Sequence, residues 1–190
     1  MYVGAIFFPL LGAMISGFLG RWIGDRAAQW STVVCMALAA ACGILAFIET
    51  VMGNGAATVR IATWMNVGGL EVAWALRYDT IAAVMVMMVT FVSTLIHLYS
   101  VGYMSHDATI PRFFAYLSLF TFMMLMLVTA DNLAQLFFGW EGVGLASYLL
   151  IGYWYEKESA NAAAMKAFIV NRVGDFGSVL SITHTIGVFG

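Results

Sequence analysis

One charged residue, Glu141, lies within an apolar stretch where a carboxylate could bind and release a proton. It is the only charged residue between Asp131 and Glu156. Ten residues of helix from Asp131 correspond to about 15 Å, roughly half the thickness of a bilayer hydrocarbon core. A carboxylate at that depth opposes insertion by about 2.5–3.5 kcal/mol, so a functional role is its default interpretation.

The next apolar segment carries three more charges, Lys166, Arg172 and Asp175. Arg172 and Asp175 are three residues apart, so on a helix they are neighbours and can neutralise each other. If the two segments are antiparallel helices, Arg172 lies about 18 Å from the cytoplasmic surface, level with Glu141. Lys166 would lie about 9 Å from that surface, where it either extends to the headgroups or reaches inward.

These four residues together predict a proton site inside the membrane. Desolvation favours a neutral glutamate, whereas a neighbouring Arg172 or Lys166 favours the carboxylate. Movement of the cation would therefore load or release a proton at Glu141. The alternative is a fixed ion pair with only a structural role.

The composition requires a membrane to surround these residues. Of 190 residues, 63% are hydrophobic and 9% are charged, against about 25% charged in soluble domains. The apolar runs are long, with charges mostly at their ends, which favours helices over a β-barrel. We predict an all-α integral membrane protein with about six transmembrane helices: Tyr2–Gly20, Trp30–Met52, Thr80–Tyr103, Phe113–Ala130, Leu133–Tyr155 and Ala162–Phe189.

The longest connection between these helices, Gly53 to Asp79, has the pattern of a β-hairpin. Apolar and small residues alternate with charges around a turn signal at Asn66–Gly69, so we expect a hairpin at about residues 54–78. Its tryptophans, Trp64 and Trp74, suit the headgroup region or the surface of a partner. A loosely ordered loop is the alternative.

The basic residues of the short loops indicate the orientation. They lie after the first, third and fifth helices and are Arg21, Arg26, Arg112 and Lys157. By the positive-inside rule these loops are cytoplasmic. The hairpin, the turn at Asp131 and both termini are then extracytoplasmic.

The remaining residues with reactive side chains indicate no metal or redox centre in this chain. Cys35 and Cys42 share one helical face but lie about 10 Å apart along it, too far for a disulfide. The three histidines are scattered: His106 in a loop, His97 and His184 in helices. His97 is a candidate for a proton route and otherwise a buried or interfacial residue. A net charge of −2 gives no indication of nucleic-acid binding.

Two stretches resemble a known family, HLYSVGYMSHDATIPRFFAYL from His97 and GWEGVGLASYLLIGYW from Gly139. They are similar to chain L of bacterial NADH:quinone oxidoreductase, the subunit 5 of mitochondria. The resemblance implies an antiporter-like membrane-arm subunit of respiratory complex I, with Glu141 at the essential glutamate of the fifth helix. It places Lys166, Arg172 and Asp175 in the matching sixth-helix motif.

The same resemblance implies where the redox chemistry, the partners and the location of the protein lie. NADH, FMN, iron-sulfur clusters and quinone would bind to other subunits, so this chain is a non-redox subunit of a translocase, holds no cofactor and is not catalytic alone. Other complex I membrane subunits, the lipid bilayer and protons are the expected partners. The bacterial inner membrane is the preferred location over the mitochondrial one.

The resemblance also implies that the chain is incomplete. Family members continue into a second inverted repeat, so residues 1–112 would form the first three helices with the hairpin, and residues 113–190 the start of the proton-translocating module. The broken seventh helix, which supplies the lysine partner of the glutamate in the family, would lie beyond Gly190. We therefore expect that this chain does not pump alone. A structural membrane fragment with fixed ion pairs, or a component of a cation/proton antiporter complex, are the alternatives.

Overall fold

The computed structural model describes residues 1–53, 55–67 and 70–189. Its helices and strands follow one another along the chain as α1 (Tyr2–Met14), a π-helical turn η1 (Ile15–Leu19), α2 (Gly20–Ile23), α3 (Asp25–Met52), β1 (Ala57–Val67), β2 (Leu70–Tyr78), α4 (Thr80–Tyr103), α5 (Ile110–Val128), α6 (Leu133–Ile151) and α7 (Glu158–Phe189). The mainly helical fold with one hairpin confirms the predicted class.

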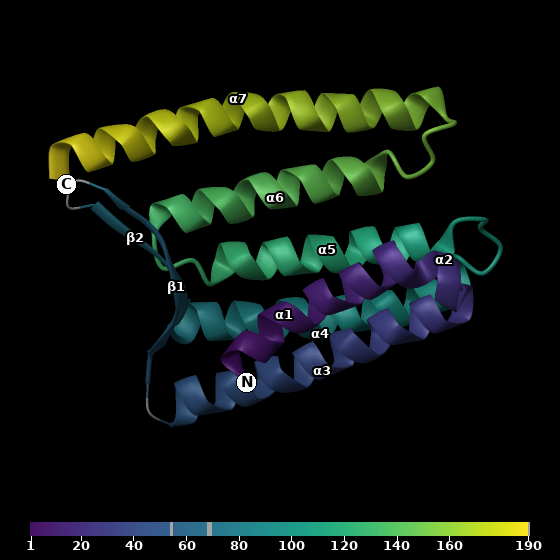
Figure 1. Ribbon diagram of the computed structural model, residues 1–190, viewed down its shortest axis with the longest axis horizontal. Helices are drawn as coiled ribbons and strands as arrows, with labels where there is room; N and C mark the ends of the chain where they lie inside the picture. Colours follow the sequence, from purple (N-terminus) through teal and green to yellow (C-terminus); the bar gives the residue numbers. More distant parts are fainter. Residues whose placement is uncertain (54, 68–69, 190) are drawn as a thin grey trace.

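The long helices run roughly parallel or antiparallel to one another, with the hairpin at one end of the assembly (Figure 1). Helices α1, α3, α4 and α5 pack on one another, α6 packs on α5, and α7 packs on α6. α7 is therefore the outermost helix and has the fewest protein neighbours. Both ends of the chain lie at the hairpin end of the bundle, as does the α5–α6 turn (Figure 1).

Five helical segments of the described residues are long and apolar enough to cross a membrane, and they correspond, with shifted ends, to the first five predicted spans: Tyr2–Ile23, Asp25–Met52, Thr80–Tyr103, Ile110–Val128 and Leu133–Ile151. The sixth predicted span corresponds to α7, which is long enough but falls short in apolar character. Its middle carries Lys166, Arg172 and Asp175. α7 nevertheless lies alongside α6 over most of its length (Figure 1).

Local sequence signals fix several helix ends. Asp79 caps α4, since its Oδ1 accepts a hydrogen bond from the Ala82 amide at 2.8 Å, which satisfies one of the free donors of the first turn. Pro111 lies in the first turn of α5, where a missing amide hydrogen costs nothing. α6 ends at Ile151, four residues earlier than predicted, because the chain turns at Gly152.

The predicted hairpin is confirmed, with antiparallel pairing from Ala57↔Tyr78 to Val67↔Leu70 and two register shifts within β1. The predicted turn signal includes Gly68 and Gly69, which lie outside the described residues. Trp64 and Trp74 also pack within the protein. Their ring centroids lie 5.2 Å apart, and the ring centroid of Trp74 lies 4.9 Å from that of Phe138 in α6.

The free edge of β2 attaches the hairpin to the α5–α6 turn. Arg77 N donates to Thr129 O at 2.9 Å, and the Asn132 side-chain amide donates to Ala73 O at 2.7 Å. The buried Gln135 accepts from Ala75 N at 3.1 Å. These bonds satisfy backbone groups at an otherwise open sheet edge and fix the position at which α6 begins.

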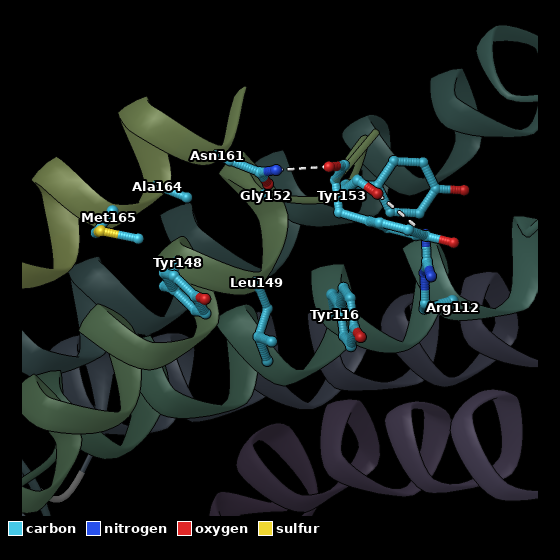
Figure 2. Close-up of a pocket in the computed structure, with 10 residues that line it drawn as sticks. Arg112, Tyr116, Tyr148, Leu149, Gly152, Tyr153, Asn161, Ala164 and Met165 are labelled. Carbon is cyan, nitrogen blue, oxygen red and sulfur yellow. Dashed lines mark hydrogen bonds between the residues drawn. The ribbon is translucent and has the colours of Figure 1, made fainter. Parts of the chain in front are cut away.

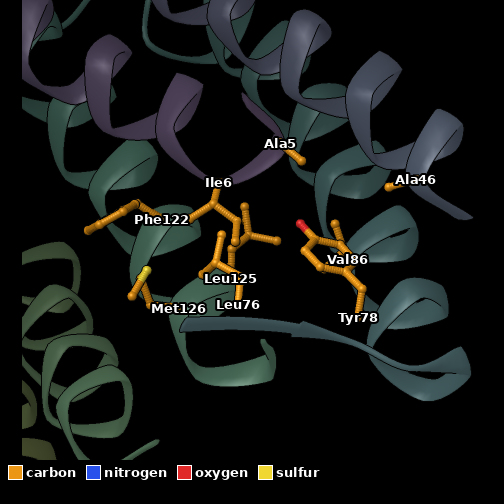
Figure 3. Close-up of a cluster of buried hydrophobic side chains, with 9 residues drawn as sticks. All are labelled: Ala5, Ile6, Ala46, Leu76, Tyr78, Val86, Phe122, Leu125 and Met126. Carbon is orange, nitrogen blue, oxygen red and sulfur yellow. The ribbon is translucent and has the colours of Figure 1, made fainter. Parts of the chain in front are cut away.

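Beneath the hairpin lies the main apolar core, drawn in Figure 3: Ala5, Ile6, Ala46, Leu76, Tyr78, Val86, Phe122, Leu125 and Met126. It joins α1, α3, α4 and α5 to β2. The Tyr78 hydroxyl donates to Tyr2 O at 3.0 Å, and burial raises the pKa of Tyr78 well above its ordinary value. The hairpin is thus part of the folded core.

The two cysteines are free thiols, as predicted. Both lie on the face of α3 that packs on α1. A methyl group added to Gly12 of α1 would lie 3.3 Å from the Cys35 Cβ, and a methyl group added to Gly4 would lie 3.3 Å from the Cys42 Sγ.

Candidate functional site

Glycines hold α6 close to α5 around Glu141. A methyl group at Gly139 would lie 2.7 Å from the backbone N and Cα of Leu127 in α5, and one at Gly142 would overlap the Met123 side chain. Small residues that let two backbones approach are the usual basis of helix packing in membranes. The glycines around Glu141 therefore serve close packing of α6 on α5.

The opposite side of α6 receives side chains from α7. A methyl group at Gly144 would overlap the side-chain amide of Asn171, and the rings of Tyr148 and Phe168 lie 5.4 Å apart. These contacts set the register between α6 and α7. They place Arg172 opposite Glu141.

Glu141, Arg172 and Asp175 form one charged cluster between α6 and α7. Arg172 Nη1 donates to Glu141 Oε1, and the same nitrogen lies 3.7 Å from Asp175 Oδ2. Glu141 lies near the middle of α6 and Arg172 near the middle of α7. The predicted pairing at a common depth is therefore present.

Two aromatic residues complete the cluster. The Trp140 indole donates to Asp175 Oδ1 at 3.0 Å, and the Arg172 guanidinium lies 4.5 Å from the ring centre of Phe168. Sequence reasoning missed both, because an aromatic residue in a membrane helix usually packs or faces lipid. Trp140 lies directly beside Glu141 in the chain, yet adjacent helical residues face different directions, so spacing alone gave no signal.

The three charged side chains differ in their exposure. Asp175 is 8% exposed, Glu141 24% and Arg172 46%. The aspartate is therefore enclosed by α6 and α7, whereas the guanidinium and part of the glutamate lie at the open rim of this helix pair.

The structure does not bring Lys166 into this cluster. Lys166 and Asp175 are nine residues apart on α7, about two and a half turns, which places them on opposite sides of the helix. Lys166 is exposed, and within the described part of the chain no carboxylate lies at ion-pair distance from it. The site residues predicted from sequence thus divide into a cluster of three and one outward-facing lysine.

A second polar cluster lies between α4 and α5 and is centred on His97. Its Nε2 lies 2.9 Å from Ser118 Oγ, and its Nδ1 lies 2.8 Å from the carbonyl oxygen of Ser93. Ser93 Oγ lies 2.6 Å from Thr121 Oγ1. All four side chains are buried, and that of His97 is fully inaccessible.

The described residues contain no group of three His, Cys, Asp or Glu side chains close enough to hold a metal ion. His106 lies in the turn after α4 and His184 is exposed on α7.

Two family models match the chain. Residues 64–114 match the N-terminus of NADH-ubiquinone oxidoreductase (complex I) chain 5, and residues 130–190 match the transmembrane region shared by NADH:quinone oxidoreductase and the Mrp antiporter. The second match contains the whole charged cluster and the first contains His97.

Relatives match the chain over nearly its whole length. NADH-ubiquinone oxidoreductase chain 5 of Chondrus crispus is 48% identical over 189 residues, which cover 100% of this chain and 28% of the relative. NADH-quinone oxidoreductase subunit L of Rhodobacter capsulatus is 51% identical over 181 residues, which cover 92% of this chain and 25% of the relative. The chain thus spans little more than a quarter of the length of these relatives. Relatives of these two kinds and the membrane helices place the chain in an inner membrane, bacterial or mitochondrial.

A solved structure has the same fold. A chain of membrane-bound sulfane sulfur reductase, an archaeal respiratory membrane complex, superimposes with a TM-score of 0.82 at 18% identity. The match covers 100% of this chain and 38% of the other.

Proposed function

The chain belongs to the family of NADH-ubiquinone oxidoreductase chain 5 and NADH-quinone oxidoreductase subunit L, and we propose that it forms part of the membrane arm of a proton-pumping NADH:quinone oxidoreductase. Glu141 is the group that takes up and releases the proton, while Arg172 and Asp175 control its charge. Other membrane subunits of the complex are its partners, and NADH, FMN, iron-sulfur clusters and quinone bind to those other subunits. The bacterial inner membrane is our preferred location.

Charge balance in the cluster is the observation that supports this proposal. Two carboxylates, Glu141 and Asp175, share the single guanidinium of Arg172. If both acids are ionised, one negative charge remains uncompensated inside the membrane, where an unpaired charge is expensive. One proton, or a second cation brought nearby, removes that cost.

Exchange of ion-pair partners provides a way to move the proton. Arg172 Nη1 contacts Glu141 and lies only 3.7 Å from Asp175, so a small displacement changes which acid it neutralises. When Arg172 moves toward Asp175, Glu141 loses its cation and takes up a proton; when Arg172 returns, the proton is released. Asp175 is held in place for this exchange by the Trp140 indole.

Lys166 has a separate role in this proposal. It lies on the side of α7 away from Asp175 and is exposed, so it faces lipid or a neighbouring part of the membrane arm. There it can transmit charge displacement from the next element to α7. The lysine therefore acts on the cluster through the position of α7, not through direct pairing.

The substitution Glu141→Gln in the assembled oxidoreductase tests the proposal, because it keeps the shape of the side chain and removes the titratable group. NADH-driven proton uptake into vesicles should fall severely, while NADH oxidation by an artificial acceptor should be retained. Glu156→Gln, on the exposed turn after α6, is the matched control and should pump normally. Normal pumping by Glu141→Gln would contradict the assignment.

A fixed ion pair is the competing interpretation, supported by the contact that Arg172 already makes with Glu141. Proteoliposomes that contain only this chain test whether it moves protons or other cations by itself. We expect no Glu141-dependent proton flux from them, since the chain spans little more than a quarter of its relatives. Flux that depended on sodium or potassium would instead favour the antiporter alternative, which the description of the second family model also names.

A further inference from the structure

An amphipathic pocket opens at the cytoplasmic end of α5, α6 and α7, away from the charged cluster (Figure 2). Its volume is about 330 Å³. Arg112 and Tyr116 come from α5, Tyr148 and Leu149 from α6, and Met165 from α7; the α6–α7 connection closes the outer end.

The two ends of the pocket differ in polarity. At the membrane surface it is lined by Arg112, the backbone and rings of Tyr153 and Tyr155, and Asn161. Farther from Arg112 it is lined by Tyr148, Ala164 and Met165, with Leu149 between these residues and the Arg112 end (Figure 2). A ligand that fits has a polar group at the surface and a hydrocarbon part below it.

Arg112 carries a charge that no group in the described part of the chain neutralises. Within the described ranges, no carboxylate lies at ion-pair distance from its guanidinium. The guanidinium lies 4.9 Å and 5.2 Å from the ring centres of Tyr153 and Tyr155, and its Nη2 donates to Tyr153 O at 3.0 Å. The rings and this bond fix the cation at the pocket without cancelling its charge.

Asp107, a carboxylate that bonds to the same Tyr153, is engaged by neutral donors. Asp107 accepts hydrogen bonds from the Tyr153 hydroxyl at 2.7 Å and from the Trp154 indole at 3.1 Å. Burial, with Asp107 nearby, raises the pKa of Tyr153 to about 12, so its hydroxyl remains a donor to Asp107. Arg112 is thus the only charged side chain that lines the pocket.

We propose that this pocket binds one phospholipid with an anionic headgroup, whose phosphate pairs with Arg112 and whose acyl chain lies along Leu149 and Met165. An arginine matches phosphate because its planar donors can form two parallel hydrogen bonds. Basic pockets between membrane helices on the cytoplasmic side are where such headgroups bind. The hydroxyls of Tyr116 and Tyr148 have no hydrogen-bond partner in the described part of the chain, and both line the same pocket.

A neighbouring hollow, also lined by Arg112 and Tyr116, fits this ligand less well. It contains Arg21 together with Asp25, so an acidic group lies among its lining residues. Its other walls are mostly glycine, alanine and the α5 start, without a deeper apolar end of the kind that Leu149 and Met165 provide. We therefore assign the lipid to the pocket between α5, α6 and α7.

Native mass spectrometry of the purified 190-residue chain, released from nanodiscs of phosphatidylcholine with phosphatidylglycerol, tests the proposal. The wild-type chain should retain one phosphatidylglycerol in preference to phosphatidylcholine. Arg112→Gln should lower that retention about tenfold, the loss expected for one hydrogen bond to a charged group. The control Arg26→Gln removes a cytoplasmic arginine that does not line the pocket and should change retention less than twofold.

A second variant keeps the charge and fills the apolar end. Leu149→Trp should also reduce retention of phosphatidylglycerol, which separates lipid binding from any folding defect of Arg112→Gln. Addition of inorganic phosphate at millimolar concentration should not displace the lipid. Equal retention of both lipids, equal loss in the Arg26 control, or full displacement by inorganic phosphate would each overturn the proposal.

Discussion

The α4–α5 and α6–α7 interfaces both place polar side chains inside the membrane, but they do so under opposite conditions. Between α4 and α5, His97 and three hydroxyl groups bond to one another and are almost completely buried. Between α6 and α7 the groups carry full charges, and Arg172 is 46% exposed. One cluster is enclosed by helices on all sides and the other lies at an open rim.

We interpret the α4–α5 cluster as a structural network, and the difference supports the proposal that the α6–α7 cluster is the functional one. In the α4–α5 cluster each hydroxyl has a partner within the bundle, so nothing is left to exchange. In the α6–α7 cluster one cation serves two acids, and among the long helices α6 is the main packing partner of α7. A cluster whose charges do not balance, on a helix with few neighbours, can change its pairing at low cost.

Removal of the imidazole should give the largest loss of stability. His97→Ala deletes a fully buried ring, leaves Ser118 without its partner and opens a cavity. Interhelical hydrogen bonds in membranes contribute about 0.6–1.7 kcal/mol each, and a cavity adds to that. We expect the free energy of unfolding to fall by about 2–4 kcal/mol, measured by denaturant titration in mixed micelles.

The matched control for this loss is His106→Ala, in the exposed turn after α4. It should change the free energy of unfolding by less than about 0.5 kcal/mol. If both histidines proved equally dispensable, the α4–α5 cluster would not be a structural network.

Gly139 and Gly144 allow the side of α6 that packs on α5 to be compared with the side that packs on α7. Gly139→Ala places a methyl group 2.7 Å from the backbone of Leu127, so α5 and α6 must separate, at a cost of about 1–3 kcal/mol. Gly144→Ala overlaps only the side-chain end of Asn171, which can rotate away, and should cost less than about 1 kcal/mol. The same titration measures both, and a reversed order would mean that α7 is held more rigidly than α5.

Much of this architecture could be predicted from sequence because lipid imposes simple rules. The lengths of the apolar segments predicted the first five helices, and the alternation of apolar and charged residues after Gly53 predicted the hairpin. Asp79 and Pro111 are residue types typical of helix starts, and α4 and α5 begin beside them. The depth argument that paired Glu141 with Arg172 worked because both helices are straight and antiparallel.

Other features depended on tertiary contacts that no local pattern encodes. Helical spacing linked Arg172 to Asp175, but which side of α7 faces α6 was not known, so Lys166 remained ambiguous. The bond from Trp140 to Asp175 joins residues 35 positions apart. Attachment of β2 to the α5–α6 turn relies on Asn132 and Gln135, whose polar side chains at a helix start also fit simple capping.

The energy of the Glu141–Arg172 pair should be modest despite its depth. A double-mutant cycle with Glu141→Gln and Arg172→Gln should give a coupling of about 1 kcal/mol, since half-exposed pairs rarely exceed that. The exposed pair Arg77–Asp79, at 3.8 Å, is the reference and should give less. A coupling of several kcal/mol would indicate a fixed pair and would argue against exchange of partners.

The smallest effect concerns Asp107, a carboxylate in the turn after α4 that is held by neutral hydrogen-bond donors. Burial raises its pKa, but hydrogen bonds from Tyr153, Thr109 and Trp154 outweigh this and hold the pKa below its ordinary value. An acid whose pKa is lower when folded stabilises the protein above its unfolded pKa, near 4, and loses that contribution as the pH falls through the folded pKa. The Asp107→Asn variant should therefore be less stable than the unmodified chain at neutral pH, and it should lose less stability than the unmodified chain when the pH falls below about 4.

The control for this pH dependence is Asp131→Asn in the exposed α5–α6 turn, whose side chain accepts no hydrogen bond within the described residues. It removes the same charge without removing a bonded carboxylate, so its acid limb should match that of the unmodified chain. Both Asp107 and Asp175 accept a bond from a tryptophan indole, but among the described residues only Asp175 of these two has an arginine within ion-pair distance. In our proposal, water and neutral donors suffice to hold an ionised acid at the aqueous surface, whereas an acid between membrane helices needs a cation, and that need would make the α6–α7 cluster responsive to the position of charge.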